Sequence, residues 1–279
     1  MIIIKILNLK INNKLYHMAS KKQNLLNKFY NNDNILEIGV DEAGRGPMLG
    51  RVYSAAVILP KSDNFNHSLM KDSKKFTSEK KLNEAADYIK KNAIAWSVSY
   101  CTEQEIDKIN ILQATHKAMH GAISDITQNM QTNMQSNIQS NMQSNMQSNM
   151  QSNMQSNMQS NIQSNNFDIA TFTNYKLLID GNNFKPYTKY SDNTGFVQIP
   201  HVCIEGGDNK YTSIAAASIL AKTTRDNYIH ELCKNNEYLD DYYQISKNKG
   251  YGTQAHRDGI IKNGICEFHR KTFGICKNY

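Results

Sequence analysis

The chain has 279 residues and a net charge of +7 at neutral pH, so it can form one large domain or two small ones and favours polyanionic partners. Its five scattered cysteines contain no Cys-x-x-Cys pair, which excludes a recognisable zinc site or disulfide framework and favours reduced thiols in a cytoplasm. No apolar run approaches the roughly 18 residues that a membrane-spanning helix needs, so we expect no membrane partner.

An N-terminal extension, residues 1–33, is expected to be poorly ordered and to lie outside the folded domain. Its apolar start, residues 1–7, is too short for a signal peptide and lacks the arginines of a transit peptide. Met18 is a second candidate for the start of translation. The folded domain is therefore expected over residues 34–279.

The first predicted strand, residues 35–40, leads into a chemically distinctive segment. Its apolar run ends in Asp41 and Glu42, and the segment Gly44-Arg45-Gly46-Pro47 follows. The glycines permit a turn and a close approach of the backbone to a ligand, and arginine offers a planar donor fork for phosphate. Two acids alone would suit a polar turn, but the whole run favours metal-assisted phosphate chemistry.

Strands and helices follow up to residue 126. The strand 52–59 comes soon after Pro47, which suits an antiparallel neighbour of the first strand. Asn110 is a candidate cap between two helices. The other elements predicted here are a loop over 72–77, a helix over 78–91, a strand over 93–100, and helices over 103–109 and 111–126.

Residues 127–166 repeat the unit Asn-Met-Gln-Ser almost without error and contain no charged residue. In a helix of about 3.6 residues per turn, a period of four drifts by roughly 40° per repeat, so the methionines would never form one burying face. We therefore expect a disordered insertion within the domain. A Met-rich or prion-like interaction tract is the alternative interpretation.

The remaining elements predict an α/β fold. A strand over 175–180 is followed by a broken strand over 197–204, which carries Pro200 as an edge strand can. Helices are expected over 211–233 and 253–262. This order indicates a mixed five-stranded sheet flanked by helices on both faces, with a C-terminal helical part.

Four acids stand at the ends of predicted strands or loops: Asp41, Glu42, Asp180 and Asp208. Taken singly, Asp180 suits a turn cap before Gly181, and Asp208 suits the N-cap of a helix. Taken together, they favour a cation site, because clustered carboxylates repel one another and Mg²⁺ prefers oxygen ligands. Two such cations about 4 Å apart can activate a water and stabilise the leaving oxygen of a phosphodiester.

The segment 41–47 resembles the first motif of the type 2 ribonucleases H, the ribonuclease HII family. Residues 178–182 are similar to the family's third-acid motif, and Asp208 with residues 213–226 is similar to its fourth. Asp226 lies well inside the predicted helix, so the metal role falls to Asp208. Further similar runs are residues 72–75, 110–115, 250–253 and 269–273, and departures are Met48 and Phe76.

The resemblance implies a ribonuclease H-like fold and two Mn²⁺ or Mg²⁺ ions held by the four acids. It implies that Gly44, Arg45 and Gly46 read the 2′-OH of a ribonucleotide, which distinguishes RNA from DNA. It also implies that Tyr251 packs on the following deoxyribose. Apart from the resemblance, Lys74 and Lys75 lie in a predicted loop where an ammonium group can meet phosphate. The structural alternatives are a core tyrosine and a solvated loop lysine.

By the same resemblance, we expect a monomeric endonuclease that cuts the RNA strand of RNA–DNA hybrids. It would also cut at single ribonucleotides in duplex DNA, leaving 3′-OH and 5′-phosphate ends, and serve ribonucleotide excision and primer removal. Two rival interpretations are a resolvase- or integrase-like nuclease of the same fold and a non-catalytic hybrid-binding protein. His256 and His269 are interpreted as structural or phosphate-facing, since metals can deprotonate water without them.

Overall fold

A central sheet organises the computed structural model, which describes residues 25–62, 64–149, 174–191 and 195–279, with backbone alone for 133–149. Its strands lie in the order β3-β2-β1-β4-β7. The pairs β1–β2 and β2–β3 are antiparallel, whereas β1–β4 and β4–β7 are parallel, so the predicted mixed five-stranded sheet is confirmed. The strands are β1 (Leu36–Ala43), β2 (Val52–Ile58), β3 (Ala95–Cys101), β4 (Tyr175–Asp180) and β7 (His201–Ile204).

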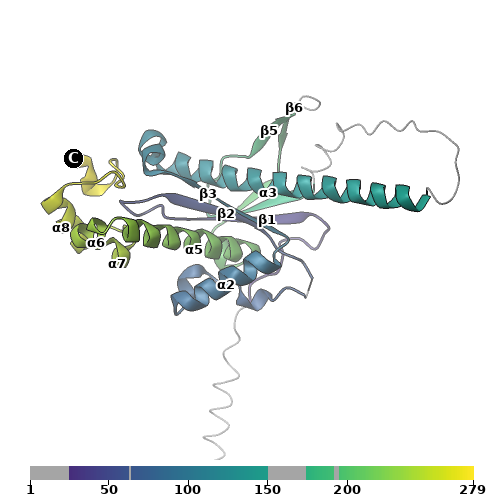
Figure 1. Ribbon diagram of the computed structural model, residues 1–279, viewed down its shortest axis with the longest axis horizontal. Coiled ribbons are helices and arrows are strands. Elements are labelled where there is room, and N and C mark those ends of the chain that lie inside the picture. Colours follow the sequence, from purple (N-terminus) through teal and green to yellow (C-terminus); the bar gives the residue numbers. More distant parts are fainter. Residues whose placement is uncertain (1–24, 63, 150–173, 192–194) are drawn as a thin grey trace, which may run out of the picture.

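Helices cover both faces of this sheet (Figure 1). Side chains of a strand alternate between faces, so Ile38 and Ile58 pack with helix α3 (Glu103–Asn149) on one side. On the other side, Ala55 and Val57 pack with α2 (Glu79–Asn92) and α5 (Thr212–Asn235). The α2 helix begins as predicted, because the Ser78 side chain accepts a hydrogen bond from the Lys81 N–H.

The α5 helix lies unusually close to β1. A Cβ atom on Gly39 would lie 2.2 Å from the carbonyl carbon of Ser213, a distance that no real Cβ tolerates. The run Ala215-Ala216-Ala217, fully buried against the sheet, extends this close packing along the helix. Small residues on both elements therefore set the depth at which α5 crosses the strand that carries Asp41.

The α3 helix contains the predicted break at Asn110, whose φ of 65° and ψ of 164° are not helical. Its side chain accepts a hydrogen bond from the Gln113 N–H, as a cap does. The predicted end at Ile126 is wrong, because the helix continues to Asn149 and thus enters the repeat. No glycine or proline interrupts it there, and Met130 still packs against the core between α3 and the sheet. Residues 150–166 of the repeat lie outside the described residues.

The predicted strand over 197–204 is corrected to two short strands that belong to different sheets. Its first part is β6 (Gly195–Gln198), which pairs with β5 (Thr188–Ser191) in a separate hairpin. Its second part is β7, at the edge of the main sheet. The break falls at Pro200, which has no N–H to donate and whose carbonyl accepts from the Leu177 N–H.

The C-terminal part forms a small helical layer at one end of the sheet (Figure 1). Its elements are α6 (Tyr238–Tyr243), α7 (Ile245–Asn248), α8 (Gln254–Asn263) and the 3₁₀ helix η4 (Gly274–Asn278). Together with Met48 and Leu49, their apolar side chains enclose a separate core cluster. This cluster joins the C-terminal part to the loop that follows β1.

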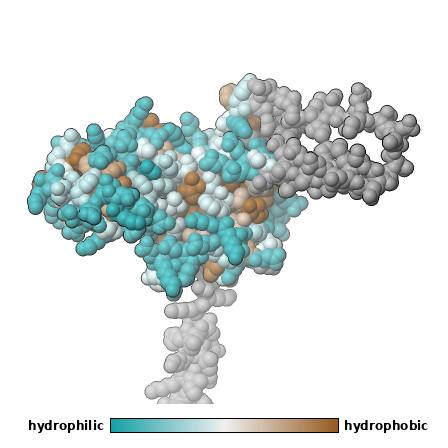
Figure 2. All heavy atoms as spheres, viewed as in Figure 1, coloured by the Kyte–Doolittle hydropathy of each residue, from teal (hydrophilic) through white to brown (hydrophobic). Residues whose placement is uncertain are grey.

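The end of the predicted N-terminal extension contacts the domain. Asn27 pairs with Tyr211 at the start of α5, and the Tyr30 and Asn31 N–H groups donate to the Glu37 carboxylate. Residues 1–24 lie outside the described residues. Among the helices that the structure describes, none is long and apolar enough to cross a membrane. The face in Figure 2 is mainly hydrophilic.

Candidate active site

A pocket of about 460 Å³ opens at the carboxyl ends of β1 and β4, beside α5. Every site residue predicted from the sequence lines it: Asp41, Glu42, Gly44, Arg45, Gly46, Lys74, Asp180, Asp208 and Tyr251. The other lining residues are Ala43, Ser73, Ser218, Lys222, Arg225, Asp226, Lys247, Asn248 and Lys249. The pocket therefore combines a group of carboxylates with a group of cations.

The parallel pairing of β1 with β4 brings the first acids together. Asp41 lies near the end of β1 and is only 5 % exposed, and its Oδ1 accepts a 2.7 Å hydrogen bond from the Glu42 N–H. Asp180 is the last residue of β4, and its Oδ1 accepts a 2.6 Å hydrogen bond from the Gly207 N–H. Parallel neighbours end at the same edge of a sheet, so the three acids share that edge.

Asp208 enters from the short 3₁₀ helix η3 (Gly207–Asn209) and is 7 % exposed. It does not cap the following helix: α5 is preceded by Tyr211, whose side chain forms no capping hydrogen bond. The Asn209 side chain instead donates to the Asp208 carboxylate over 3.0 Å. The local alternative for Asp208, a helix N-cap, is thus wrong.

The electrostatics of the pocket disfavour four bare carboxylates. Burial, followed by the charges of Glu42 and Asp180, raises the pKa of Asp41 well above its ordinary value. Burial, with Asp72 and Asp180 nearby, likewise raises the pKa of Asp208. Burial also raises the pKa of Glu42, although Arg45 opposes this shift from 3.2 Å. Bound positive charge at this edge would relieve the repulsion.

Lys74 lies in a loop that hydrogen bonds attach to its neighbours in the fold. The Asp72 side chain accepts from the Lys74 N–H and so caps the 3₁₀ helix η2 (Ser73–Lys75). Asn209 donates to the same carboxylate, and the Ser73 and Ser218 hydroxyls lie 3.0 Å apart. The loop is thereby tied to both η3 and α5, so Lys74 faces the acids from a fixed backbone.

The loop after β1 and Tyr251 form one wall. Gly44 has a φ of +95°, and a Cβ there would lie 2.4 Å from the Nε of Arg225. Arg45 projects outward, and a Cβ on Gly46 would lie 3.5 Å from the Tyr251 ring. Tyr251 is 49 % exposed, so the alternative of a core tyrosine is wrong.

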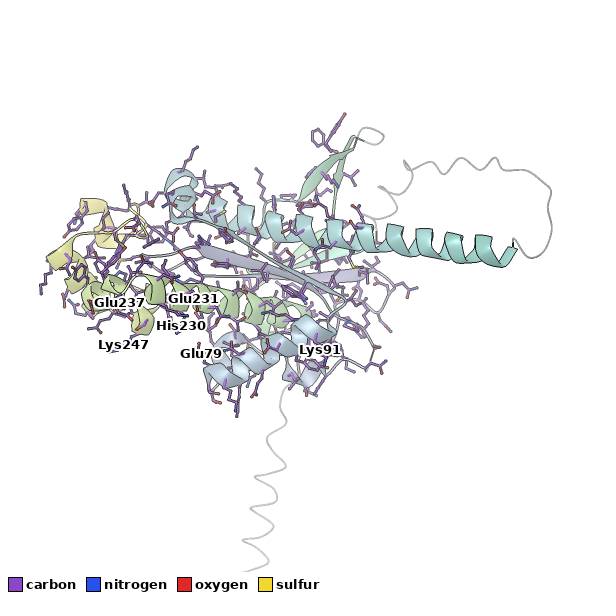
Figure 3. The ribbon with its side chains drawn as sticks, in the orientation of Figure 1. Glu79, Lys91, His230, Glu231, Glu237 and Lys247 are labelled. Carbon is purple, nitrogen blue, oxygen red and sulfur yellow. The ribbon has the colours of Figure 1, made fainter. Side chains whose placement is uncertain are left out.

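Several cations of the pocket were not assigned to it from the sequence. Lys222 forms a 2.8 Å ion pair with Asp226. Arg225 is buried, donates to the Lys249 carbonyl over 2.9 Å, and has its guanidinium carbon 5.8 Å from the Tyr251 ring centroid. Lys247, labelled in Figure 3, projects from α7, a helix that no sequence signal indicated.

Within the described parts of the chain, no three His, Cys, Asp or Glu side chains converge closely enough to enclose a metal ion by themselves. His256 and His269 are buried beneath Tyr251 and do not line the pocket, so of the two roles considered for them the structural one is confirmed. The signal that could have placed Lys222 and Arg225 is their helical spacing from Ser218 on the buried face of α5.

A family model described as Ribonuclease HII matches residues 38–131 and 122–276 of this chain. The chain belongs to the ribonuclease HII family. Its curated relatives include a Ribonuclease HII of Bacteroides thetaiotaomicron, 39 % identical over 88 % of this chain and 93 % of the relative. A Ribonuclease HII of Porphyromonas gingivalis is 38 % identical over 88 % of this chain and 92 % of the relative. The protein is thus a ribonuclease H of the HII type.

Solved structures show the same fold. Ribonuclease HII of Archaeoglobus fulgidus, from its complex with PCNA, aligns with a TM-score of 0.54 at 20 % identity over 86 % of this chain and 96 % of that one. A Bst-RNase HIII variant aligns with a TM-score of 0.51 at 12 % identity over 88 % of this chain and 68 % of that one. The ribonuclease H-like fold predicted for this chain is confirmed.

Proposed function

We propose that this chain is a metal-dependent endonuclease of RNA–DNA hybrids that also cuts at single ribonucleotides within duplex DNA. The observation that carries the proposal is the two-sided pocket. Buried acids occupy the ends of β1, β4 and η3, and a glycine-bordered loop with an exposed tyrosine stands beside them. One side suits phosphodiester hydrolysis, and the other suits selection of the sugar at the cut.

Asp41, Glu42, Asp180 and Asp208 would hold two Mg²⁺ or Mn²⁺ ions. Such ions need only one or two protein carboxylates each, with water and substrate phosphate completing the octahedron, so an enclosing cage is unnecessary. The raised pKa values of Asp41 and Asp208 fit this assignment, because clustered carboxylates favour a counter-charge. Ions of this kind supply an acidic water and neutralise charge on the leaving oxygen.

The residues of the chain itself bind and orient the nucleic acid. Lys74, Lys222 and Lys247 line the pocket around the acids and would meet phosphates on either side of the cut. Gly44, Arg45 and Gly46 would detect the 2′-OH through backbone groups, since no side chain of the glycines blocks access. Water then attacks phosphorus in line, leaving 3′-OH and 5′-phosphate ends.

Tyr251 would contact the second sugar of the junction, the step at which a ribonucleotide is followed by a deoxyribonucleotide. Its ring borders Gly46 and is half exposed, so a deoxyribose can pack on it directly after the ribonucleotide. We further propose a cytoplasmic monomer that serves ribonucleotide excision and primer removal, in agreement with the family to which the chain belongs.

Cleavage of three labelled substrates tests the proposal. Duplex DNA with one ribonucleotide and an RNA–DNA hybrid should be cut with Mg²⁺ or Mn²⁺ and left intact with chelator, whereas all-DNA duplex should stay intact throughout. Asp180→Asn is the matched inactive control, because it removes a charge and keeps the volume. Cutting of all-DNA duplex would favour a resolvase-like nuclease. Binding of hybrid without cleavage under any metal would favour a non-catalytic hybrid-binding protein.

A further inference from the structure

A fully buried arginine holds the loop after β1. Arg270 is 0 % exposed, and its Nη2 donates to the Gly44 carbonyl over 2.6 Å. Its Nη1 donates to the Arg45 and Pro47 carbonyls, and its Nε donates to the Gly50 carbonyl over 2.7 Å. Charge-assisted hydrogen bonds of this kind are stronger than neutral ones, and the planar fork fixes their directions. One side chain thus determines the shape of the whole loop.

A chain of hydrogen bonds holds Tyr251 from below. His256 Nδ1 lies 3.0 Å from the Tyr251 carbonyl, which can only accept, so Nδ1 carries the proton. His256 Nε2 must then accept from His269 Nε2, 3.0 Å away. His269 Nδ1 in turn accepts from the Cys266 N–H over 3.0 Å. Every donor in this chain points toward Tyr251, and both imidazoles are neutral.

The surroundings support these tautomers. The Tyr243 ring packs edge-on against His269 with centroids 4.8 Å apart, and the Cys266 thiol lies 3.1 Å from the His269 Nδ1. Burial lowers the pKa of His269 to about 3 and also lowers that of His256. Neither ring therefore carries charge near neutral pH, and the chain keeps a single direction.

The two supports meet in adjacent residues of the sequence. His269 belongs to the chain below Tyr251, and Arg270 holds the loop after β1. The Arg270 N–H also donates to the Met48 carbonyl, and the Met48 N–H donates to the Gly250 carbonyl, each over 2.8 Å. The loop, the turn before Tyr251 and the C-terminal segment therefore form one hydrogen-bonded unit.

We propose that His256, His269 and Arg270 are positioning residues for junction recognition. They hold the loop after β1 and the Tyr251 ring at the separation that fits a ribonucleotide followed by a deoxyribonucleotide. None of the three lines the pocket, so they act only through the groups they support. The inference rests on the proposed function, since it assigns a purpose to the spacing of the two reading groups.

Two substitutions at His256 test the chain of hydrogen bonds. In His256→Asn, the Nδ2 group can occupy the place of imidazole Nδ1 and still donate to Tyr251. In His256→Gln, the longer amide reaches toward His269 and leaves the Tyr251 carbonyl without its donor. The measurement is the ratio of single-turnover rates on single-ribonucleotide duplex and on RNA–DNA hybrid. The Gln variant should lower this ratio roughly threefold to tenfold, the factor that one lost hydrogen bond typically produces, and the Asn variant should largely preserve it.

A double substitution separates positioning from general damage. Added to Tyr251→Ala, His256→Gln should lower the ratio no further, because its effect passes through the missing ring. If His256→Gln leaves the ratio unchanged while Tyr251→Ala lowers it, the positioning role is wrong and the proposed function stands. If Tyr251→Ala also leaves the ratio unchanged, the recognition part of the proposed function fails together with this inference.

Arg270→Lys tests the support of the loop. Lysine keeps the positive charge but cannot serve four carbonyls with a fixed fork. It should lower the rate on single-ribonucleotide duplex more than the rate on hybrid, because only the former requires the loop and the Tyr251 ring to fit a ribose and the following deoxyribose at one fixed separation. Thermal melting checks folding. Equal losses on both substrates would contradict the positioning role of Arg270. If this variant does not fold, the two His256 variants still decide the proposal.

Discussion

The two sides of the pocket are built differently. The acids stand at the ends of β1 and β4 and on the 3₁₀ helix that follows β7, so the sheet itself brings them together. The groups proposed to read the sugar, Gly44-Arg45-Gly46 and Tyr251, lie on irregular segments. Hydrogen bonds from Arg270 and His256, more than two hundred residues from β1, hold them in place.

The two sides of the pocket therefore depend on different kinds of structural support. Strand ends converge by the rules of sheet pairing, so carboxylates placed there need little further support. Loops do not converge by any such rule, so their geometry requires dedicated buried donors. We expect substitutions on the acid side to abolish the reaction, and those on the reading side to change the choice of substrate.

The largest effect is expected for Asp41→Asn. Turnover should fall by about a thousandfold or more, because the variant loses a carboxylate charge that is proposed to hold the metal ions. In metal-free buffer the melting temperature should hold or rise, since the variant removes repulsion with Glu42 and Asp180 and keeps an acceptor for the Glu42 N–H. Steady-state cleavage and thermal melting measure the two effects.

The matched control is Asp226→Asn, which changes an acid of the same pocket that is already paired with Lys222. It should lower turnover far less than Asp41→Asn. An equally severe loss would indicate a metal role for Asp226 on α5, and the acids at the strand ends would not be the only metal-binding acids of the pocket that the structure describes.

The reading side is expected to respond selectively to Tyr251→Ala. A stacking contact contributes typically ~1–3 kcal/mol, which corresponds to roughly a tenfold to hundredfold slower cleavage at a single ribonucleotide. The loss on an all-RNA strand should be smaller, because the following sugar there carries its own 2′-OH. The salt dependence of binding should not change, since no phosphate contact is removed. Uniform slowing on both substrates would argue against junction reading.

Gly39→Ala tests the close packing of α5 on β1, which lies beneath both sides of the pocket. The added Cβ would meet the backbone of α5 at Ser213, and such overpacking typically lowers the free energy of unfolding by about 1–3 kcal/mol. Urea denaturation measures the loss. Gly181→Ala is the control, because a Cβ at Gly181 meets no atom within 4 Å and so causes no overpacking. Its φ of 90° adds backbone strain to the control variant. A smaller loss for Gly39→Ala than for Gly181→Ala would contradict the close packing of α5.

The smallest effect is expected for deletion of residues 133–166. The deletion keeps Met130, which packs against the core, and removes most of the Asn-Met-Gln-Ser repeat. Closing a shorter loop costs less entropy, by about 1 kcal/mol or less, so activity and melting temperature should hold or rise slightly. Loss of solubility or activity would show that the repeat supports the domain or binds a partner.

The sequence predicted the elements whose signals are local. The antiparallel strands, the cap at Ser78 and the break at Asn110 all follow from alternation, capping residues and backbone preference over a few neighbours. The acids could be predicted for the same reason, because each follows an apolar run or a glycine turn. The family motifs then indicated the loop and Tyr251.

The structure alone revealed elements whose causes are distant in the chain. Pro200 interrupts a strand whose halves pair with different partners, and only tertiary contacts decide which. The helix α3 passes its expected end because the core continues beneath Met130. The cations Lys247 and Arg225 reach the pocket through elements packed by the C-terminal core cluster.

Sequence alone therefore indicated the type of sheet, the four acids that line the pocket, and Gly44, Arg45, Gly46 and Tyr251, the residues proposed to read the sugar. These depend on patterns of a few residues and on motifs that a single chain displays. Tertiary structure decided how the reading groups are held, through the four carbonyl contacts of Arg270 and the directed pair His256–His269. The physical reason is that a buried donor is recognised only by the acceptors around it, and the carbonyls that Arg270 meets lie more than two hundred residues from it in the chain.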